Sequence, residues 1–106
     1  MKRIILIMLF IITFSGLAQA ATIDSQCRLD GKGKPLFGKV KVVNSFADYK
    51  VQVVTSFPDL KVQKVNSFPD KCGKWQFVDS FPDFTIQYVT SFPDFKIQFV
   101  NSFPGK

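Results

Sequence analysis

The sequence predicts an all-β protein, a compact repeat of about six short strands. A Ser-Phe pair recurs six times, and its serines are spaced by 11, 11, 13, 11 and 11 residues. Such regular spacing indicates a repeat architecture. Each repeat also contains a run of alternating apolar and polar residues, as in Phe84-Thr85-Ile86-Gln87-Tyr88. This alternation, in a segment rich in aromatic and β-branched residues, is typical of a half-buried strand.

The first 20 residues are predicted to be a secretory signal peptide. Lys2-Arg3 supplies the basic start, an apolar run extends from Ile4 to Ile12, and Ala18-Gln19-Ala20 resembles a cleavage site. A membrane anchor is the alternative, but the apolar run is short for a span. Residues 21–106 are then expected to form a single β-repeat domain, exported to the periplasm or secreted.

Strands are expected at each copy of the alternating pattern, including residues 38–43, 49–54 and 84–89. The intervening Ser-Phe-Pro-Asp motif predicts a turn, because proline lacks the N–H that donates a hydrogen bond to a neighbouring strand, and because Ser and Asp favour turns. The first copy carries Ala47 in place of proline. A cis bond before alanine would cost about 3 kcal/mol, so a turn shared by all copies favours trans peptide bonds.

The phenylalanines of these turns are an unusual feature, because turns face solvent. Large rings are ordinarily buried, so we expect them to fold inward as core anchors. The alternative is a platform of exposed rings on which a ligand stacks. The residues concerned are Phe46, Phe57, Phe68, Phe81, Phe92 and Phe103.

Cys27 and Cys72 are the only cysteines. An even count in an exported chain predicts one disulfide. Cys72 lies where the repeat lengthens to 13 residues, which supports the pairing. A reactive dithiol is the alternative, although no Cys-x-x-Cys motif is present.

The composition argues against catalysis. The chain has no histidine and no glutamate, so the usual general bases are missing. The recurring aspartates each fall in a turn, where hydrogen bonding to the backbone is the expected role. A calcium array would need more oxygen ligands than one carboxylate per turn. We therefore expect no enzyme activity, no cofactor and no metal site.

The polar face of the strands could bind a partner. Without Lys2 and Arg3, twelve basic residues face eight aspartates, a net charge of +4. Export argues against nucleic acid, which leaves an anionic glycan, a lipid headgroup or an acidic envelope protein. The alternative is a solvated outer face with edge-protecting lysines. The candidate binding residues are Lys50, Gln52, Lys61, Gln63, Lys96 and Gln98.

The repeated Val-Asn/Thr-Ser-Phe-Pro-Asp-x-Lys-Val/Ile-Gln, the signal peptide and the two cysteines resemble the 7(1) septoil knot domain family of small exported bacterial proteins. The repeat alone favours a solenoid or a meander, since knots are rare exceptions. The resemblance implies instead a β fold wound into a seven-crossing torus knot, and it brings no activity. We therefore expect a non-enzymatic exported structural or interaction module. After cleavage of the signal peptide, the protein is not expected to be an integral membrane protein. The alternative function is the binding of an anionic ligand or acidic partner.

Overall fold

A computed structural model describes residues 21–106, so the predicted signal peptide lies outside the described residues. This part of the chain is all-β, and it contains no helix long and apolar enough to cross a membrane. Each copy of the alternating pattern forms a strand of four or five residues. The strands are β1 (Gly38–Val42), β2 (Tyr49–Val53), β3 (Leu60–Lys64), β4 (Lys74–Phe77), β5 (Phe84–Tyr88) and β6 (Phe95–Phe99).

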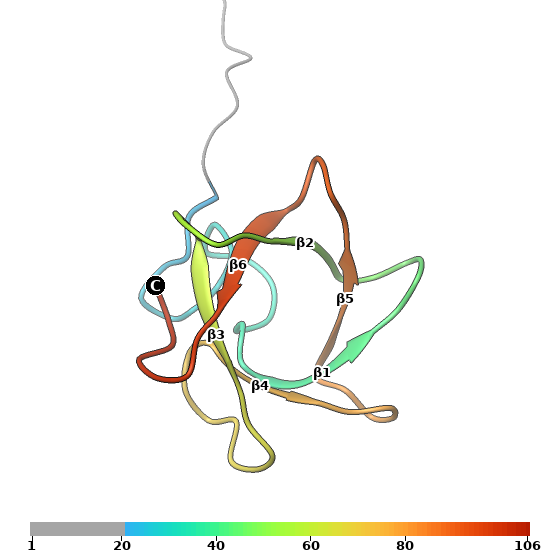
Figure 1. The fold of residues 1–106 in the computed structure, drawn as a ribbon. Coiled ribbons are helices and arrows are strands. Elements are labelled where there is room, and N and C mark those ends of the chain that lie inside the picture. Colours follow the sequence, from blue (N-terminus) through green and yellow to red (C-terminus); the bar gives the residue numbers. More distant parts are fainter. Residues whose placement is uncertain (1–20) are drawn as a thin grey trace, which may run out of the picture.

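The six strands form a closed barrel in the order β1-β4-β3-β6-β2-β5, and all neighbouring pairs are parallel. Figure 1 shows the strands surrounding a common centre. The meander suggested by the repeat alone is therefore wrong, because a meander pairs consecutive strands antiparallel. Closure leaves no long unpaired strand edge.

The alternation in the sequence separates the inside of the barrel from the outside. In the five-residue strands the first and third residues point inward, as Leu60 and Val62 do, and both of these are fully buried. Trp75 of β4 occupies an apolar position of the alternating pattern and is also fully buried. Its indole Nε1 donates to the Leu36 carbonyl at 2.9 Å, which satisfies the one polar atom of this side chain.

The chain winds around the barrel by two places at each step. From β1 it passes β5 to reach β2, and from β2 it passes β6 to reach β3. After β6 the same step leads between β3 and β4, where Gly105 exchanges two backbone hydrogen bonds with Lys61. The C-terminal turn therefore fills a seventh place. The barrel thus has seven positions, six strands and the C-terminal turn, and each element lies two positions from the element before it in the chain. This arrangement is a seven-crossing torus winding.

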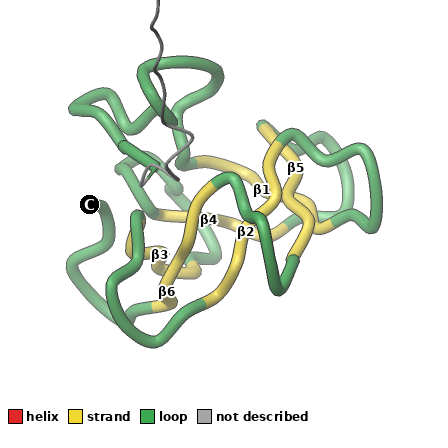
Figure 2. Tube along the Cα trace, turned by 90° about the horizontal axis from the view of Figure 1, so that it is seen from above, coloured by secondary structure: helices red, strands yellow, loops and turns green. Residues whose placement is uncertain are grey.

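Each regular turn crosses the outer face of the strand that the step passes. The turn between β1 and β2, for example, starts at one edge of β5, where the Val43 N–H donates to the Ile86 carbonyl at 2.9 Å. It ends at the other edge, where Asp48 bonds to Thr85. Figures 1 and 2 show these turns projecting outward from the strands.

The aspartate of the turn fastens it to the strand that it has crossed. The Asp94 Oδ2 accepts the Lys50 N–H at 2.7 Å, and the Asp94 N–H donates to the Lys50 carbonyl at 2.7 Å. Asp59 and Asp83 repeat this two-point clamp on other strands. Asp48 makes a related clamp with Thr85. The strand N–H groups that donate to these four carboxylates are those of Thr85, Lys96, Lys39 and Lys50.

The third turn is held in a different way. The Asp70 N–H donates to the Phe68 carbonyl of its own turn at 2.8 Å, and among the described residues no strand N–H donates to the Asp70 carboxylate. Two residues later Cys72 forms the predicted disulfide with Cys27, and the Cα atoms are 5.6 Å apart. The disulfide ties this turn to residues 21–37, which lie beside the N-terminal ends of β1 and β4 (Figure 1).

We predict that Asp94→Ala destabilises the domain by about 1–2 kcal/mol, because it removes a charge-assisted hydrogen bond to a strand N–H group. The measurement is the guanidinium chloride unfolding midpoint with the disulfide intact. Asp70→Ala is the matched control: it removes the same side chain from a turn without a clamp, and we expect a change within about 0.5 kcal/mol. Equal losses would show that the clamp contributes nothing.

We also predict that reduced, denatured protein refolds over minutes or longer. Contacts between strands and the turns that cross them join residues 37 or 44 apart, as in the Lys96–Asp59 and Lys39–Asp83 hydrogen bonds, so long loops must close before contacts form. Fluorescence of Trp75, the only tryptophan, reports the process.

A bulky domain fused after Lys106 should slow this folding further, since the C-terminal turn must reach a place between β3 and β4. Removal of that domain by proteolysis after folding should leave the stability unchanged. Refolding within milliseconds that is indifferent to the fusion would contradict the threading of this end.

Candidate functional site

The six turn phenylalanines, called here the Phe tips, are exposed rather than buried. Their exposed fractions range from 81% at Phe68 to 102% at Phe46. The expectation of core anchors is therefore wrong. The core is formed by strand residues together with Ile23, Cys27 and Leu36 of the segment before β1, and the turns lie outside it. Figure 1 shows the turns that carry the Phe tips pointing in different directions around the barrel.

The backbone explains why the rings face outward. All six Phe tips have positive φ angles, between 53° and 56°. This left-handed conformation reverses the usual direction of the side chain relative to the turn, and it is strained for a bulky residue. The residue after each tip, Pro58 for example, is half-buried instead. All described peptide bonds are trans, as predicted.

The outward residues of the strands form a continuous Lys/Gln belt around the barrel. Wherever two strands pair on this face, a lysine lies beside an amide or hydroxyl side chain, never beside another lysine. The six registered pairs are Lys39–Gln76, Lys41–Thr85, Lys50–Gln87, Lys61–Gln98, Lys74–Gln63 and Lys96–Gln52. This register spaces like charges apart along the belt.

The six predicted binding residues belong to this belt and lie on three adjacent strands, β2, β6 and β3. Their lysines are exposed. Their glutamines are half-buried, and each amide donates to a carbonyl of the turn that crosses its strand: Gln52 to Thr90 at 3.3 Å is one case. Gln63 and Gln98 do the same to Asn101 and Thr55. Within this set, the lysines are the side chains free to meet a partner.

One end of the barrel carries a partly exposed apolar rim. Val42, Val53 and Tyr88 are 42–47% exposed there. Burial raises the pKa of the Tyr88 hydroxyl above its ordinary value of 10.0. Lys64, which interrupts the apolar pattern in the sequence, places its ammonium 4.6 Å from the centre of the Phe99 ring. A cation–π contact thus explains the lysine at this rim position.

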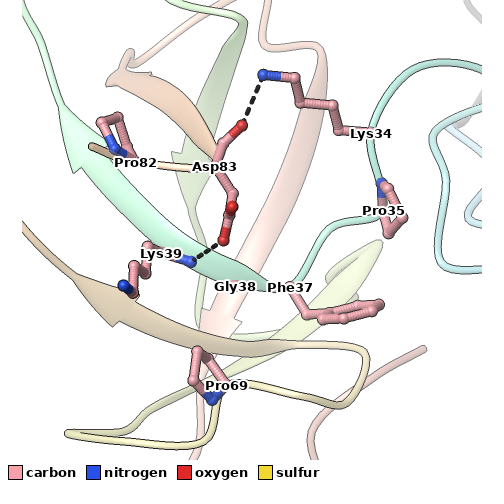
Figure 3. A pocket seen from close by; sticks show the side chains of 8 residues that line it. All are labelled: Lys34, Pro35, Phe37, Gly38, Lys39, Pro69, Pro82 and Asp83. Carbon is pink, nitrogen blue, oxygen red and sulfur yellow. Dashed lines mark hydrogen bonds between the residues drawn. The ribbon is translucent and has the colours of Figure 1, made fainter.

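A cleft of about 580 Å³ lies beside β1, where the repeat is irregular. We call it the proline cleft (Figure 3). Pro69 and Pro82 come from the turns on its two sides. The rest of the lining is Lys34, Pro35, Phe37, Gly38, Lys39 and Asp83. Sequence reasoning missed this site. The sequence feature that could have indicated it is the break in the repeat. The segment Gly33-Lys34-Pro35-Leu36-Phe37 precedes a strand but lacks the Ser-Phe pair.

The described residues contain no group of three or more His, Cys, Asp or Glu side chains that could hold a metal ion. The four clamping aspartates lie on different turns and accept backbone N–H groups. Their role is thus the backbone hydrogen bonding expected from the sequence, although the partner is a distant strand rather than the turn itself.

The model of the 7(1) septoil knot domain matches residues 33–106, which include all six strands and all six Phe tips. A comparison with curated proteins finds no match. The two-place winding seen in the barrel agrees with the description of this family.

We predict that Phe92→Gly changes the free energy of unfolding by less than about 1 kcal/mol. Glycine relieves the left-handed strain but also increases the entropy of the unfolded chain, and these effects nearly cancel. Phe95→Ala, in the core, should cost about 3–5 kcal/mol. The check is equilibrium denaturation of both variants. A loss of several kcal/mol for Phe92→Gly would mean that the ring packs against the barrel after all.

Proposed function

This chain belongs to the 7(1) septoil knot domain family, and we propose that it is a non-enzymatic exported interaction module whose contacts are made by the Phe tips. The disulfide is consistent with an exported protein. The periplasm or the extracellular space is the compartment that we propose.

The observation that supports this proposal is the combination of strain and exposure at the Phe tips. A left-handed residue is best filled by glycine or asparagine, and a solvent-exposed site is best filled by a polar residue. Phenylalanine meets neither preference, yet it occurs at all six positions, with φ near 54° and 81–102% exposure. Strained residues that are costly to the fold are characteristic of functional sites.

The tips also suit recognition by geometry. Four of the six turns are fastened at both ends across a strand, so the backbone that carries the ring is held in place. An aromatic anchor on a fixed backbone loses less entropy on binding. Several identical tips around one barrel allow several contacts at once. Such multivalent binding gains strength without a large single interface.

The test is photo-crosslinking. We expect a variant with photoreactive p-benzoylphenylalanine at Phe57, added to envelope extract from the source organism, to yield a discrete crosslinked product on irradiation. Wild-type domain in excess should abolish this product. Mass spectrometry of the product then identifies the molecule bound at the tip.

The matched control carries the same photoreactive residue at Gln26, which is exposed but lies outside the repeat. This variant should give only diffuse background. A domain in which all six Phe tips are glycine should compete much less than the wild type. The same products from both crosslinker positions, or full competition by the glycine variant, would refute recognition by the tips.

A second candidate function is the binding of an anionic envelope ligand or acidic partner by the Lys/Gln belt. The exposure of Lys50, Lys61 and Lys96 on adjacent strands favours it. We expect replacement of all three by glutamine to abolish salt-sensitive retention on envelope material, because surface charge attraction is screened by salt. Unchanged retention would leave the belt as a solvated outer surface.

A further inference from the structure

The proline cleft exists because one turn of the winding is different. Each regular turn crosses one strand on the outside of the barrel and carries an exposed Phe tip. The segment that precedes β1 dips inward instead: Leu36 is fully buried, and its carbonyl accepts hydrogen bonds from the Trp75 indole and the Gly73 N–H. The missing tip leaves a depression between Pro69 and Pro82 of the neighbouring turns.

The lining of the cleft is apolar with a few polar groups. Pro35, Phe37, Pro69 and Pro82 surround it, and Figure 3 shows the Phe37 ring beside Pro35. The compact apolar rings of proline and the flat ring of phenylalanine suit an aromatic or alicyclic group. A volume of about 580 Å³ is ordinary for a small-molecule site.

The charges of the lining favour a single negative charge on the ligand. Lys34 and Lys39 contribute two cations, and Asp83 contributes one carboxylate. The Asp83 Oδ2 accepts the Lys39 N–H at 2.8 Å and is occupied by that clamp. The Lys34 ammonium donates to the Asp83 carbonyl at 2.6 Å, which uses one of its three protons (Figure 3).

The backbone around Lys34 is held in place before any ligand arrives. The Lys34 N–H donates to the Tyr49 hydroxyl at 3.3 Å. A Cβ at Gly33 would lie 2.6 Å from the same hydroxyl, so only glycine permits this approach. A cation anchored in this way loses less entropy on binding than a free surface lysine.

We propose that the proline cleft binds an aromatic group joined to a carboxylate, with Lys34 as the partner of the carboxylate and Phe37 and the prolines around the ring. Such a ligand is either a small aromatic acid or the C-terminal aromatic residue of a peptide chain. The cleft is separate from the Phe tips, so this proposal stands or falls independently of the proposed function.

The experiment is a titration of the full domain with 3-phenylpropionate, followed by backbone amide NMR. We expect saturable shifts confined to residues 33–39 and to the turns of Pro69 and Pro82. The amide of the same compound should bind at least fivefold more weakly, because it lacks the charge that Lys34 pairs with. If neither 3-phenylpropionate nor a peptide probe gives saturable shifts at millimolar concentration, the proposal is overturned.

Matched variants separate the cleft from the general positive charge. Lys34→Gln should weaken binding at least fivefold. Lys50→Gln should leave it unchanged, because Lys50 is the repeat equivalent of Lys39 with the same clamp, from Asp94, but does not line the proline cleft. Likewise Pro82→Ala should weaken binding, and Pro93→Ala should not. Equal effects of the two lysine variants would indicate diffuse attraction and refute the site.

A short peptide ending in phenylalanine identifies the source of the ligand. If its free-acid form binds at least tenfold more tightly than phenylpropionate, and its amidated form does not, the cleft recognises the end of a peptide chain. Equal or weaker binding of the peptide acid assigns the cleft to small aromatic acids. Equal binding of the acid and amide forms of both probes would contradict the role of Lys34.

Discussion

The clamp between a turn aspartate and a distant strand is the interaction on which the rest of this fold depends. A parallel pair of strands ordinarily needs a long crossover, usually a helix, to return the chain to its starting edge. Here the return takes six residues, because the turn crosses only one strand and is fastened on both sides of it. Without a carboxylate to accept the strand N–H at the far edge, a turn this short would lack an anchor where the next strand begins.

The same clamp determines which side chains face outward. A turn that lies over the outer face of a strand has the barrel beneath it and solvent above it. The proline lies half-buried between them, and the left-handed conformation of the preceding residue directs its ring away from the barrel. The exposure of the Phe tips thus follows from the path of the backbone.

The irregular parts of the repeat carry the remaining features. At the third turn, where the Asp70 N–H bonds within its own turn, the disulfide of Cys72 provides the attachment. Before β1, the segment without a Ser-Phe pair supplies Leu36 to the core and leaves the proline cleft outside. A regular repeat gives every position an equivalent, so a site unlike the others can arise only where the repeat is broken. Both breaks are visible in the amino-acid sequence, as a 13-residue spacing and as a missing Ser-Phe pair.

The sequence by itself determined the local structure: the strands, their inward and outward residues, the burial of Trp75 and the pairing of the two cysteines. These features follow from the two-residue period of a strand and from the composition of the whole chain. Both can be assessed without knowing which strands are paired. Only the tertiary structure decided that the strands are all parallel, that Asp94 bonds to Lys50, and that the Phe tips are exposed. Each of these depends on which strand lies under which turn. Since the repeats are nearly identical in sequence, the sequence pattern does not distinguish which strands are paired in the barrel. The path of the chain, which crosses one strand between each strand and the next, determines the pairing.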